Sequence, residues 1–489
     1  MILGIDLGTS VVKAAAFATD GEIMAVEGRR VKLYNPRPEC SEQDIEETLE
    51  ALGEVVHAVT RDTNEPVEAI GLTGQGDGLW LLDEEGRSVR RAMTWLDARA
   101  NSVVEEWMSS GVFEEYYRKS GNITFPGTPA AIMSALSKED PESLERASTA
   151  GYCKDVALQR LTGERATDAS DASEPFMDHE SRDYDPGILE LFGLEEYQRL
   201  LAPIDPSPGP MRPLNAEGAQ LIGLPEGTPV HNGPFDLPAT AMGAGVTRVG
   251  DGVIIVGTTL ACEVLTDRVD TSGEPGGQTL CALEPDRWLR AMPAMVGTAS
   301  MDLTLGLLGS EHEEIEEFLA ESPPGANGVT VLPFFSRSGE RAPFVEPDAR
   351  GQLSGMTLGT TRADVVRAVA EGVGYAARHC LEAAGLSGEV TICGGGAESL
   401  AWRQVLADVL QQPLKIARRP EVGARGAAMA AMISAGIEFD HAEWTRSEGA
   451  VQPSEDLAEL YEEGFRGYLT RVEAARALWR KFHPEGPQA

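Results

Sequence analysis

Two segments of this chain share one pattern, in which a short aliphatic strand turns at glycine and hydroxyl residues into a second strand. The first segment covers residues 2–17 and the second covers residues 253–265. The turn residues are Gly8, Thr9 and Ser10 in the first segment and Gly257, Thr258 and Thr259 in the second. A supersecondary unit that recurs after about half of the chain indicates a duplicated fold, although Gly-Thr turns are common enough for such a match to arise by chance.

Strands and helical patterns alternate around both segments, which predicts α/β layers. Residues 69–73 predict a short apolar strand, and residues 41–59 predict a helix with Ser41 as its N-cap. The chain of 489 residues is long enough for two or three domains at roughly 100–200 residues each. The Gly- and Ala-rich stretch 240–252 is the best candidate for a domain boundary.

The formal net charge of −37 excludes some classes of partner. A surface this acidic repels nucleic acid and anionic membranes, so we expect neither as a partner. The N-terminal sequence lacks the basic and apolar regions of a secretory signal, and no apolar run reaches the roughly 18–20 residues that span a bilayer. The cysteines, at positions 40, 153, 262, 281, 380 and 393, form no CxxC pair, which favours buried thiols in a reducing compartment. We therefore expect a cytoplasmic protein.

The first turn carries the residues that phosphate and Mg²⁺ binding require. Asp6 ends a strand, where its carboxylate can hold Mg²⁺ directly or through water. Gly8 lets a phosphate approach the backbone, and Thr9 and Ser10 offer hydroxyl and N–H groups to phosphate oxygens. Lys13 follows three residues later and can neutralise phosphate charge or simply remain in solvent. Two such turns facing each other across a cleft would hold a nucleotide between two domains.

A glycine triplet late in the chain suits the other end of a nucleotide. Residues 390–393 predict a buried strand that runs into Gly394, Gly395 and Gly396, and a helix is expected from about Ser399. Glycines let the backbone lie flat against a ribose or adenine, and the N-terminus of a helix favours anionic groups. The alternative is a left-handed turn that packing alone requires.

These three elements together resemble the actin-like ATPase superfamily and, more narrowly, the FGGY family of carbohydrate kinases. Further segments similar to that family follow in the right order over about residues 1–435. They are residues 94–99; Lys154 and Asp155 with residues 161–164 and 167–170; residues 339–343 and 348–351; residues 355–372; and residues 402–408 and 423–428.

The resemblance implies an α/β fold of two actin-like (ribonuclease H-like) domains with a cleft between them. The first domain is expected over residues 1–245 and the second, with the adenosine site, over residues 246–440. Residues 441–489 are expected to be a helical tail packed on the second domain, with an amphipathic helix over residues 455–481. The activity implied is ATP-dependent phosphorylation of a hydroxyl of a small sugar or polyol, with Mg²⁺. The resemblance also allows a homodimer, since dimers are common among relatives.

The resemblance implies a role for single residues as well. The family has its catalytic base in a Gly-rich segment before the second turn, and Asp236 is the only acid in the matching residues 231–240. We therefore expect Asp236 to be the base and to bind the metal together with Asp6, although Asp236 could also serve as a helix N-cap. The expected substrate-binding residues are Gln75, Gly76, Asp77, Trp95, Asp97 and Phe235. The expected ATP-binding residues are Gly8, Thr9, Ser10, Lys13, Gly257, Thr258, Thr259, Gly394, Gly395, Gly396, Ala397 and Ser399.

The substrate is expected to be a four- or five-carbon polyol or ketose. Glycerol kinases have Arg-Glu and xylulose kinases have Met-His where this chain has Gly76-Asp77, and the surrounding Gly-Gln-Gly-Asp-Gly looks like erythritol kinases. Erythritol is therefore the first expectation, and xylulose or another pentulose is the second. Leu237 departs from the Gln or Asn that often follows the base, which removes one polar contact. The rival interpretations are a non-catalytic ATP-binding sugar sensor and an actin-like or chaperone-like machine.

Overall fold

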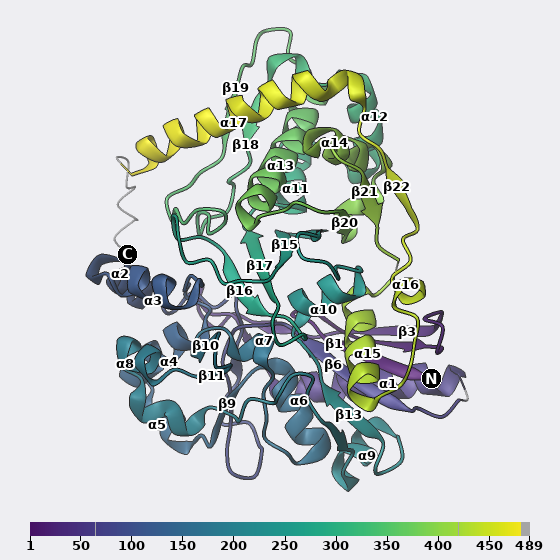
Figure 1. Cartoon of the computed structure of the whole chain (residues 1–489). Coiled ribbons are helices and arrows are strands. Elements are labelled where there is room, and N and C mark those ends of the chain that lie inside the picture. The colour runs from purple at the N-terminus through teal and green to yellow at the C-terminus, as the bar shows by residue number, and fades with distance from the viewer. Residues whose placement is uncertain (64, 419, 481–489) are drawn as a thin grey trace.

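The computed structural model describes residues 1–63, 65–418 and 420–480. Its two main β-sheets divide between the halves of the chain, and both have helices packed against them (Figure 1). The six-stranded sheet has the order β12-β13-β6-β1-β2-β3, and the seven-stranded sheet has the order β16-β17-β15-β14-β20-β21-β22. The first sheet consists of β1 (Ile2–Leu7), β2 (Val11–Phe17), β3 (Ile23–Arg30), β6 (Ala69–Gly74), β12 (Met211–Pro213) and β13 (Pro229–Asn232). The second consists of β14 (Gly252–Val256), β15 (Leu260–Thr266), β16 (Gln278–Cys281), β17 (Trp288–Ala294), β20 (Val390–Cys393), β21 (Leu414–Ile416) and β22 (Gly449–Val451).

The two sheets repeat one topology. In the first, β1 pairs antiparallel with β2 and parallel with β6, while β2 continues to β3 and β6 continues to β13. In the second, β14 pairs antiparallel with β15 and parallel with β20, while β15 continues to β17 and β20 continues to β21. Each run of five strands therefore has the same order and the same directions. The predicted duplication of an α/β fold is confirmed.

Helices cover both faces of each sheet because the strands are apolar on both sides. In β1, Leu3, Ile5 and Leu7 face a core formed with α1 (Ile45–Thr63) and α6 (Cys153–Thr162). Ile2 faces the opposite core, which is formed with α15 (Val422–Ala435). A strand buried on both faces reads as a continuous apolar run, which is how residues 2–7 read in the sequence.

The helices α10 (Asp236–Gly243) and α15 lie against each other between the two sheets (Figure 1). Helix α15 comes late in the chain but packs on β1 and β6 of the first sheet, whereas α10 packs its apolar face against the second sheet. Contact this close requires glycine: a Cβ at Gly426 would overlap the carbonyl oxygen of Ala239, and one at Gly71 would overlap that of Ala427. The chain thus passes from its first half to its second close to residues 245 and 246. The domain boundary at this position stays a prediction.

The remaining helices surround these layers. The first half adds α2 (Asn101–Ser110), α3 (Val112–Ser120), α4 (Pro129–Glu139), α5 (Pro141–Arg146), α7 (Ala169–Ala172), α8 (Pro186–Phe192) and α9 (Ala216–Ile222). The second half adds α11 (Thr298–Leu308), α12 (Ile315–Glu321), α13 (Arg362–Ala384), α14 (Leu400–Leu410), α16 (His441–Trp444) and α17 (Ala458–Trp479). Helix α17 packs on α13 and α14, as a tail on the second half would, while residues 481–489 lie outside the described residues.

One predicted helix start is wrong. Helix α1 begins at Ile45, and the carboxylate of Asp44, with Oδ1 accepting from the N–H groups of Glu46 and Glu47, caps it. Ser41 instead precedes a short strand, β5 (Glu42–Gln43), and its hydroxyl bonds to that of Thr94. The tertiary contacts of Ser41 therefore override its preference for an N-cap position.

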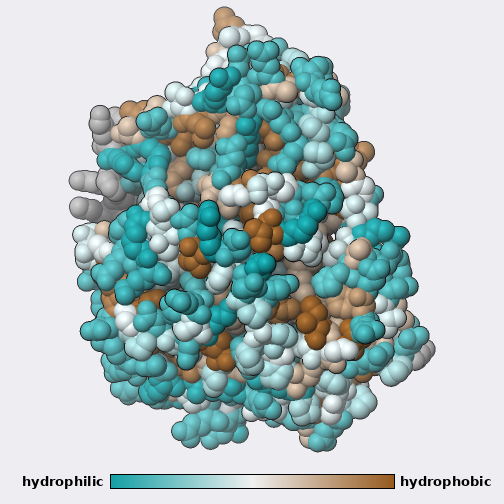
Figure 2. All heavy atoms as spheres, in the orientation of Figure 1, coloured by the Kyte–Doolittle hydropathy of each residue, from teal (hydrophilic) through white to brown (hydrophobic). Residues whose placement is uncertain are grey.

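The surface and the thiols agree with the expectations from composition. Figure 2 shows a face on which hydrophilic residues predominate, with small apolar patches across the middle. All six cysteines are buried and free. Within the described ranges, no helix combines the length and the apolarity that crossing a membrane requires.

Candidate active site

The segment that carries the predicted base, Asp236, follows β13 and is held by a buried ionic cluster. Lys154 is fully buried, and its Nζ lies 3.1 Å from Asp155, 2.7 Å from Asp168 and 2.9 Å from Asp171. Asp155 in turn accepts a hydrogen bond of 2.8 Å from Nδ2 of Asn232, the last residue of β13. Because a buried cation needs paired carboxylates, this cluster fixes the end of β13, from which the segment carrying Asp236 continues.

Asp236 is the first residue of α10, one position after the helix N-cap. The N-cap is Phe235, and its backbone N–H donates a 3.0 Å hydrogen bond to Oγ of Ser170. The alternative that Asp236 is itself the N-cap is therefore wrong, because the residue before it has that position. At the first turn of a helix the carboxylate is favoured by the dipole, but burial, with the nearby charges of Asp6 and Asp77, raises its pKa from 3.8 to about 8.

Asp6 lies at the end of β1, where the first turn begins. Its Oδ1 is buried and has no hydrogen-bond partner in the described part of the chain. Burial raises the pKa of Asp6 to about 6, and Lys13 opposes that rise. Since Asp6 and Asp236 interact electrostatically, a divalent cation near both would satisfy the unpaired oxygen. In the described ranges no three His, Cys, Asp or Glu side chains are arranged to hold a metal, so phosphate oxygens and water would have to complete the coordination of Mg²⁺.

The first turn is anchored by side chains from three other segments. The hydroxyl of Thr9 lies 3.1 Å from Oε1 of Gln75 and accepts a 2.9 Å hydrogen bond from Nε1 of Trp95, while its carbonyl accepts a 2.7 Å bond from Gln43. Ser10 is exposed. The predicted phosphate-binding residue Thr9 and the predicted substrate-binding residues Gln75 and Trp95 are therefore in direct contact.

Lys13 does not point freely into solvent. Its Nζ lies 3.0 Å from Glu421, the residue that precedes α15. Its side chain is still 39% exposed, so the ammonium can be drawn to a phosphate. The ion pair ties the first turn to a helix from the second half of the chain.

The second turn and the glycine triplet meet at the end of β14. The N–H of Gly257 donates to the carbonyl of Thr259 at 3.0 Å, and Thr258 is exposed. A Cβ at Gly394 would lie 2.6 Å from the carbonyl oxygen of Val256, which shows that the triplet needs glycine to lie beside the turn. The predicted order is confirmed, since β20 ends at Cys393 and Ser399 caps α14 with a 3.0 Å bond from the N–H of Trp402.

A cavity of about 580 Å³ opens beside the triplet. Gly395, Gly396 and Ser399 line it together with Thr298 at the start of α11 and Trp402 of α14. The volume of this cavity and the two glycines that line it suit the binding of a nucleoside. Ala397 is buried and does not line this cavity.

Asp77 and Gly76, which are predicted to bind the substrate, lie beside the ring of Phe235. Gly76 lies flat against the ring of Phe235, because a Cβ there would be 2.6 Å from that ring. Asp77 has a φ of 55°, a strained conformation for a residue other than glycine. Its Oδ1 is buried without a hydrogen-bond partner in the described residues. Burial raises the pKa of Asp77 to about 7, and Arg341 opposes that rise.

Both carboxylate oxygens of Asp97 accept hydrogen bonds within the fold. Its Oδ2 accepts a 2.8 Å bond from the N–H of Ser41, and its Oδ1 accepts a 2.7 Å bond from Nε of Arg99. The side chain is fully buried. These bonds hold the segment that carries Trp95, and a contact of Asp97 with the substrate stays a prediction.

Three polar residues near Asp77 had no role predicted from the sequence. Arg341, from the quoted segment 339–343, packs its guanidinium 4.3 Å from the ring centroid of Phe125 and 5.5 Å from that of Trp95. Glu174 and Gln278 come from opposite halves of the chain and bond to each other. The motif containing Arg341 could have indicated it, but no pattern in the sequence singled out Glu174 or Gln278.

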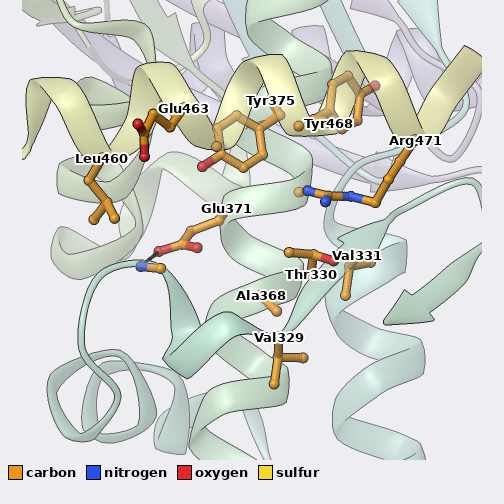
Figure 3. Close-up of a pocket in the computed structure, with 14 residues that line it drawn as sticks. Val329, Thr330, Val331, Ala368, Glu371, Tyr375, Leu460, Glu463, Tyr468 and Arg471 are labelled. Atoms are coloured by element: carbon orange, nitrogen blue, oxygen red, sulfur yellow. Dashed lines mark hydrogen bonds between the residues drawn. The ribbon is translucent and has the colours of Figure 1, made fainter. Parts of the chain in front are cut away.

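A cavity elsewhere in the second half holds none of these candidates. It measures about 270 Å³ and lies between α13 and α17 (Figure 3). Glu371 points into this region and accepts a 2.9 Å hydrogen bond from the N–H of Gly325, while Tyr375 and Arg471 lie around it. This cavity shares no residue with the cavity beside the glycine triplet.

Comparisons with known proteins identify the family of this chain. The family model described as the N-terminal domain of the FGGY family of carbohydrate kinases matches residues 1–243, and that of the C-terminal domain matches residues 283–435. The chain is 32% identical to an erythritol kinase of Brucella abortus (strain 2308), with 98% of this chain and 97% of that protein covered. It is 31% identical to a xylulose kinase of Escherichia coli (strain K12), with 99% of both chains covered.

Solved structures share the fold over nearly the whole chain. A xylulose kinase from Rhodospirillum rubrum superposes with a TM-score of 0.89 at 26% identity, covering 98% of this chain and 99% of the other. A gluconate kinase from Lactobacillus acidophilus superposes with a TM-score of 0.91 at 21% identity, covering 98% and 99%, and this likeness concerns the fold alone. The predicted fold class is confirmed. By both family models and by these relatives, the chain belongs to the FGGY family of carbohydrate kinases.

Proposed function

We propose that this carbohydrate kinase transfers the γ-phosphoryl group of ATP to a hydroxyl of a small neutral polyol, with erythritol as the first candidate and xylulose or another pentulose as the second. The observation that carries the proposal is the carboxylate of Asp236 at the start of α10, which interacts electrostatically with both Asp6, at the predicted phosphate side, and Asp77, at the predicted acceptor side. The similarity to an erythritol kinase and to a xylulose kinase supports the size of the acceptor.

Different residues of the chain would bind ATP and the acceptor. The first turn with Lys13 would bind the phosphates, the second turn would face it, and Gly395 and Gly396 would lie against the nucleoside. Asp6 and Asp236 would hold Mg²⁺, which neutralises charge on the transferring phosphoryl group. In the mechanism that we propose, Asp236 accepts the proton of the attacking hydroxyl, and a raised pKa makes it a better base than an ordinary carboxylate.

The acceptor binds on the other side of Asp236. Asp77 offers an unpaired oxygen to a hydroxyl, while the ring of Phe235 and the Trp95 side chain would border the carbon chain. We further propose that the reaction occurs in the cytoplasm, where free thiols like those of this chain persist. A homodimer and closure of the two halves on the substrates stay predictions.

The experiment is an acceptor screen over three- to six-carbon polyols and ketoses that follows ADP release. We expect turnover with a tetritol or pentulose, and we expect Asp236→Asn to lower kcat by about 10³-fold while KM changes by less than about threefold. The control is Asp440→Asn, which alters a cap of α16. No ADP release by the wild-type protein with any acceptor would favour the sensor, and an unchanged kcat in Asp236→Asn would refute the role of the base.

A further inference from the structure

Two buried polar side chains meet at the acceptor side of the cleft from opposite halves of the chain. Glu174 follows α7 in the first half, and Gln278 is the first residue of β16, the edge strand of the second sheet. Nε2 of Gln278 donates a hydrogen bond to Oε2 of Glu174. They are only 4% and 3% exposed, so this contact is part of the interior and not of the surface.

One carboxylate oxygen of the Glu174–Gln278 pair has no hydrogen-bond partner among the described residues. Oε1 of Glu174 is buried and has no hydrogen-bond partner among the residues that the structure describes, which is also true of Oδ1 of Asp77. A buried carboxylate oxygen without a donor costs about 1–3 kcal/mol or more, so such atoms at a binding site indicate missing ligand donors. Hydroxyl groups of an acceptor are donors of this kind.

Asp77 is the carboxyl that interacts electrostatically with both Asp236 and Glu174. The guanidinium of Arg341 interacts with both Asp77 and Glu174. Nε of Arg341 donates to the carbonyl of Pro293 at 3.1 Å, which fixes the guanidinium in this place. A carbon chain that presents one hydroxyl to Asp236 and the next to Asp77 would therefore extend toward Glu174.

The strand that carries Gln278 is itself bonded to the first half. Asn122 donates to the carbonyl of Ser173 at 2.7 Å and accepts a hydrogen bond from the N–H of Thr279, the residue after Gln278. The N–H of Cys281 donates to Oγ of Ser173 at 3.3 Å. Strand β16 is thus held against the segment that carries Glu174, and the wall around Glu174 needs both halves of the chain.

We propose that Glu174, oriented by Gln278, is a specificity-determining residue that accepts a hydrogen bond from the acceptor hydroxyl at the end opposite to the phosphorylated one. This inference rests on the proposed function. It assigns the substrate class as neutral compounds with a hydroxyl at both ends, such as alditols. The unpaired oxygens of Asp77 and Glu174 require hydrogen-bond donors, which a hydroxyl supplies and an ionised carboxylate does not.

The test removes one hydroxyl of the acceptor and the side chain of Glu174, separately and together, and compares kcat/KM. The acceptors are erythritol and butane-1,2,3-triol, which keeps one terminal hydroxyl for phosphorylation and lacks the other. We expect the wild-type enzyme to favour erythritol by about 5- to 100-fold in kcat/KM, because the triol leaves the buried oxygen of Glu174 without a donor. In Glu174→Ala that preference should fall below about threefold, because the hydroxyl and its partner are lost together. A purely structural role would lower kcat/KM for both acceptors equally and leave the preference intact.

Two further variants keep the result interpretable. Glu174→Gln preserves the size of the side chain and should retain part of the preference even if the alanine variant folds poorly. Glu371→Gln is the matched control, since Glu371 is also 4% exposed but lies at the cavity between α13 and α17 (Figure 3); it should leave the preference unchanged. A wild-type preference that persists in both Glu174 variants overturns the assignment of Glu174 alone. A wild-type enzyme that phosphorylates neither acceptor nor any other polyol or sugar overturns the proposed function as well.

Discussion

Replacement of Asp236 by asparagine should stabilise the ligand-free protein, and increasingly so as the pH rises. The reason is the cost of ionising this carboxyl in the cleft, where burial raises its pKa from 3.8 to about 8. Between these two values the folded protein holds a proton on Asp236 that the unfolded chain has lost. The free energy of unfolding therefore decreases by about 1.4 kcal/mol for each pH unit in this window. Asparagine has no such proton and lacks this dependence.

The size of the effect follows from the two pKa values. From pH 5 to pH 8, the contribution of Asp236 to the free energy of unfolding should fall by roughly 3–4 kcal/mol, with the last part flattening as Asp236 titrates in the folded state. The entropy of unfolding for a chain of this length is roughly 1 kcal/mol per kelvin. The melting temperature of Asp236→Asn should therefore gain about 3–4 °C on that of the wild type over this range.

The assay is thermal unfolding of both proteins without ligands, in buffers from pH 5 to pH 8.5 at constant ionic strength. Asp6 and Asp77, whose pKa values burial also raises, to about 6 and about 7, are present in both proteins, so the difference reports Asp236 together with its electrostatic coupling to these two groups. A difference in melting temperature that stays constant or narrows with pH would refute the idea that Asp236 is protonated in the empty cleft.

Three other substitutions test the surroundings of the site. Lys154→Met leaves buried carboxylates without their cation and should lower the free energy of unfolding by about 3–5 kcal/mol, measured by denaturant unfolding. Gly71→Ala places a Cβ against the carbonyl of Ala427 and should cost about 3 kcal/mol, seen as a lower melting temperature with little change in KM if the protein folds. Lys13→Ala should raise KM for ATP about tenfold in steady-state kinetics and leave KM for the acceptor unchanged, whereas equal changes in both would contradict a phosphate contact. Glu421→Gln, which frees Lys13 from its 3.0 Å ion pair, should lower KM for ATP in the same assay.

The parts of the fold that were predictable from sequence are those that local patterns determine. The two strand–turn–strand units of the sheets need only short aliphatic runs and a glycine, so both could be located from residues 2–17 and 253–265. The glycine triplet after β20 was recognisable for the same reason. Motifs with ionic partners, such as Lys154 with Asp155, indicated the family, but only the structure shows that they hold the end of β13.

Contacts between distant segments were not predictable in the same way. Ser41 has the local chemistry of an N-cap, yet its partners Thr94 and Asp97 come from more than fifty residues later. Glu174 and Gln278 are separated by 104 positions, and each by itself is an ordinary polar residue in a loop or at a strand end. A period of two or of 3.6 residues carries no information about such a pair.

The protonation of the cleft also explains how so acidic a chain can bind a triphosphate. The formal charge of −37 counts Asp6, Asp77 and Asp236 as ionised, and three such charges beside the phosphates would repel them strongly. Burial, the largest cause in each case, raises their pKa values to about 6, 7 and 8, so near neutral pH the empty cleft holds part of this charge as protons. The same carboxyls become useful as anions only when cationic groups or hydroxyl donors reach them, and those arrive with the substrates. In the proposed mechanism, burial lowers the repulsion that ATP meets on entry, and Asp236 accepts the proton of the hydroxyl once the bound substrates have made it an anion.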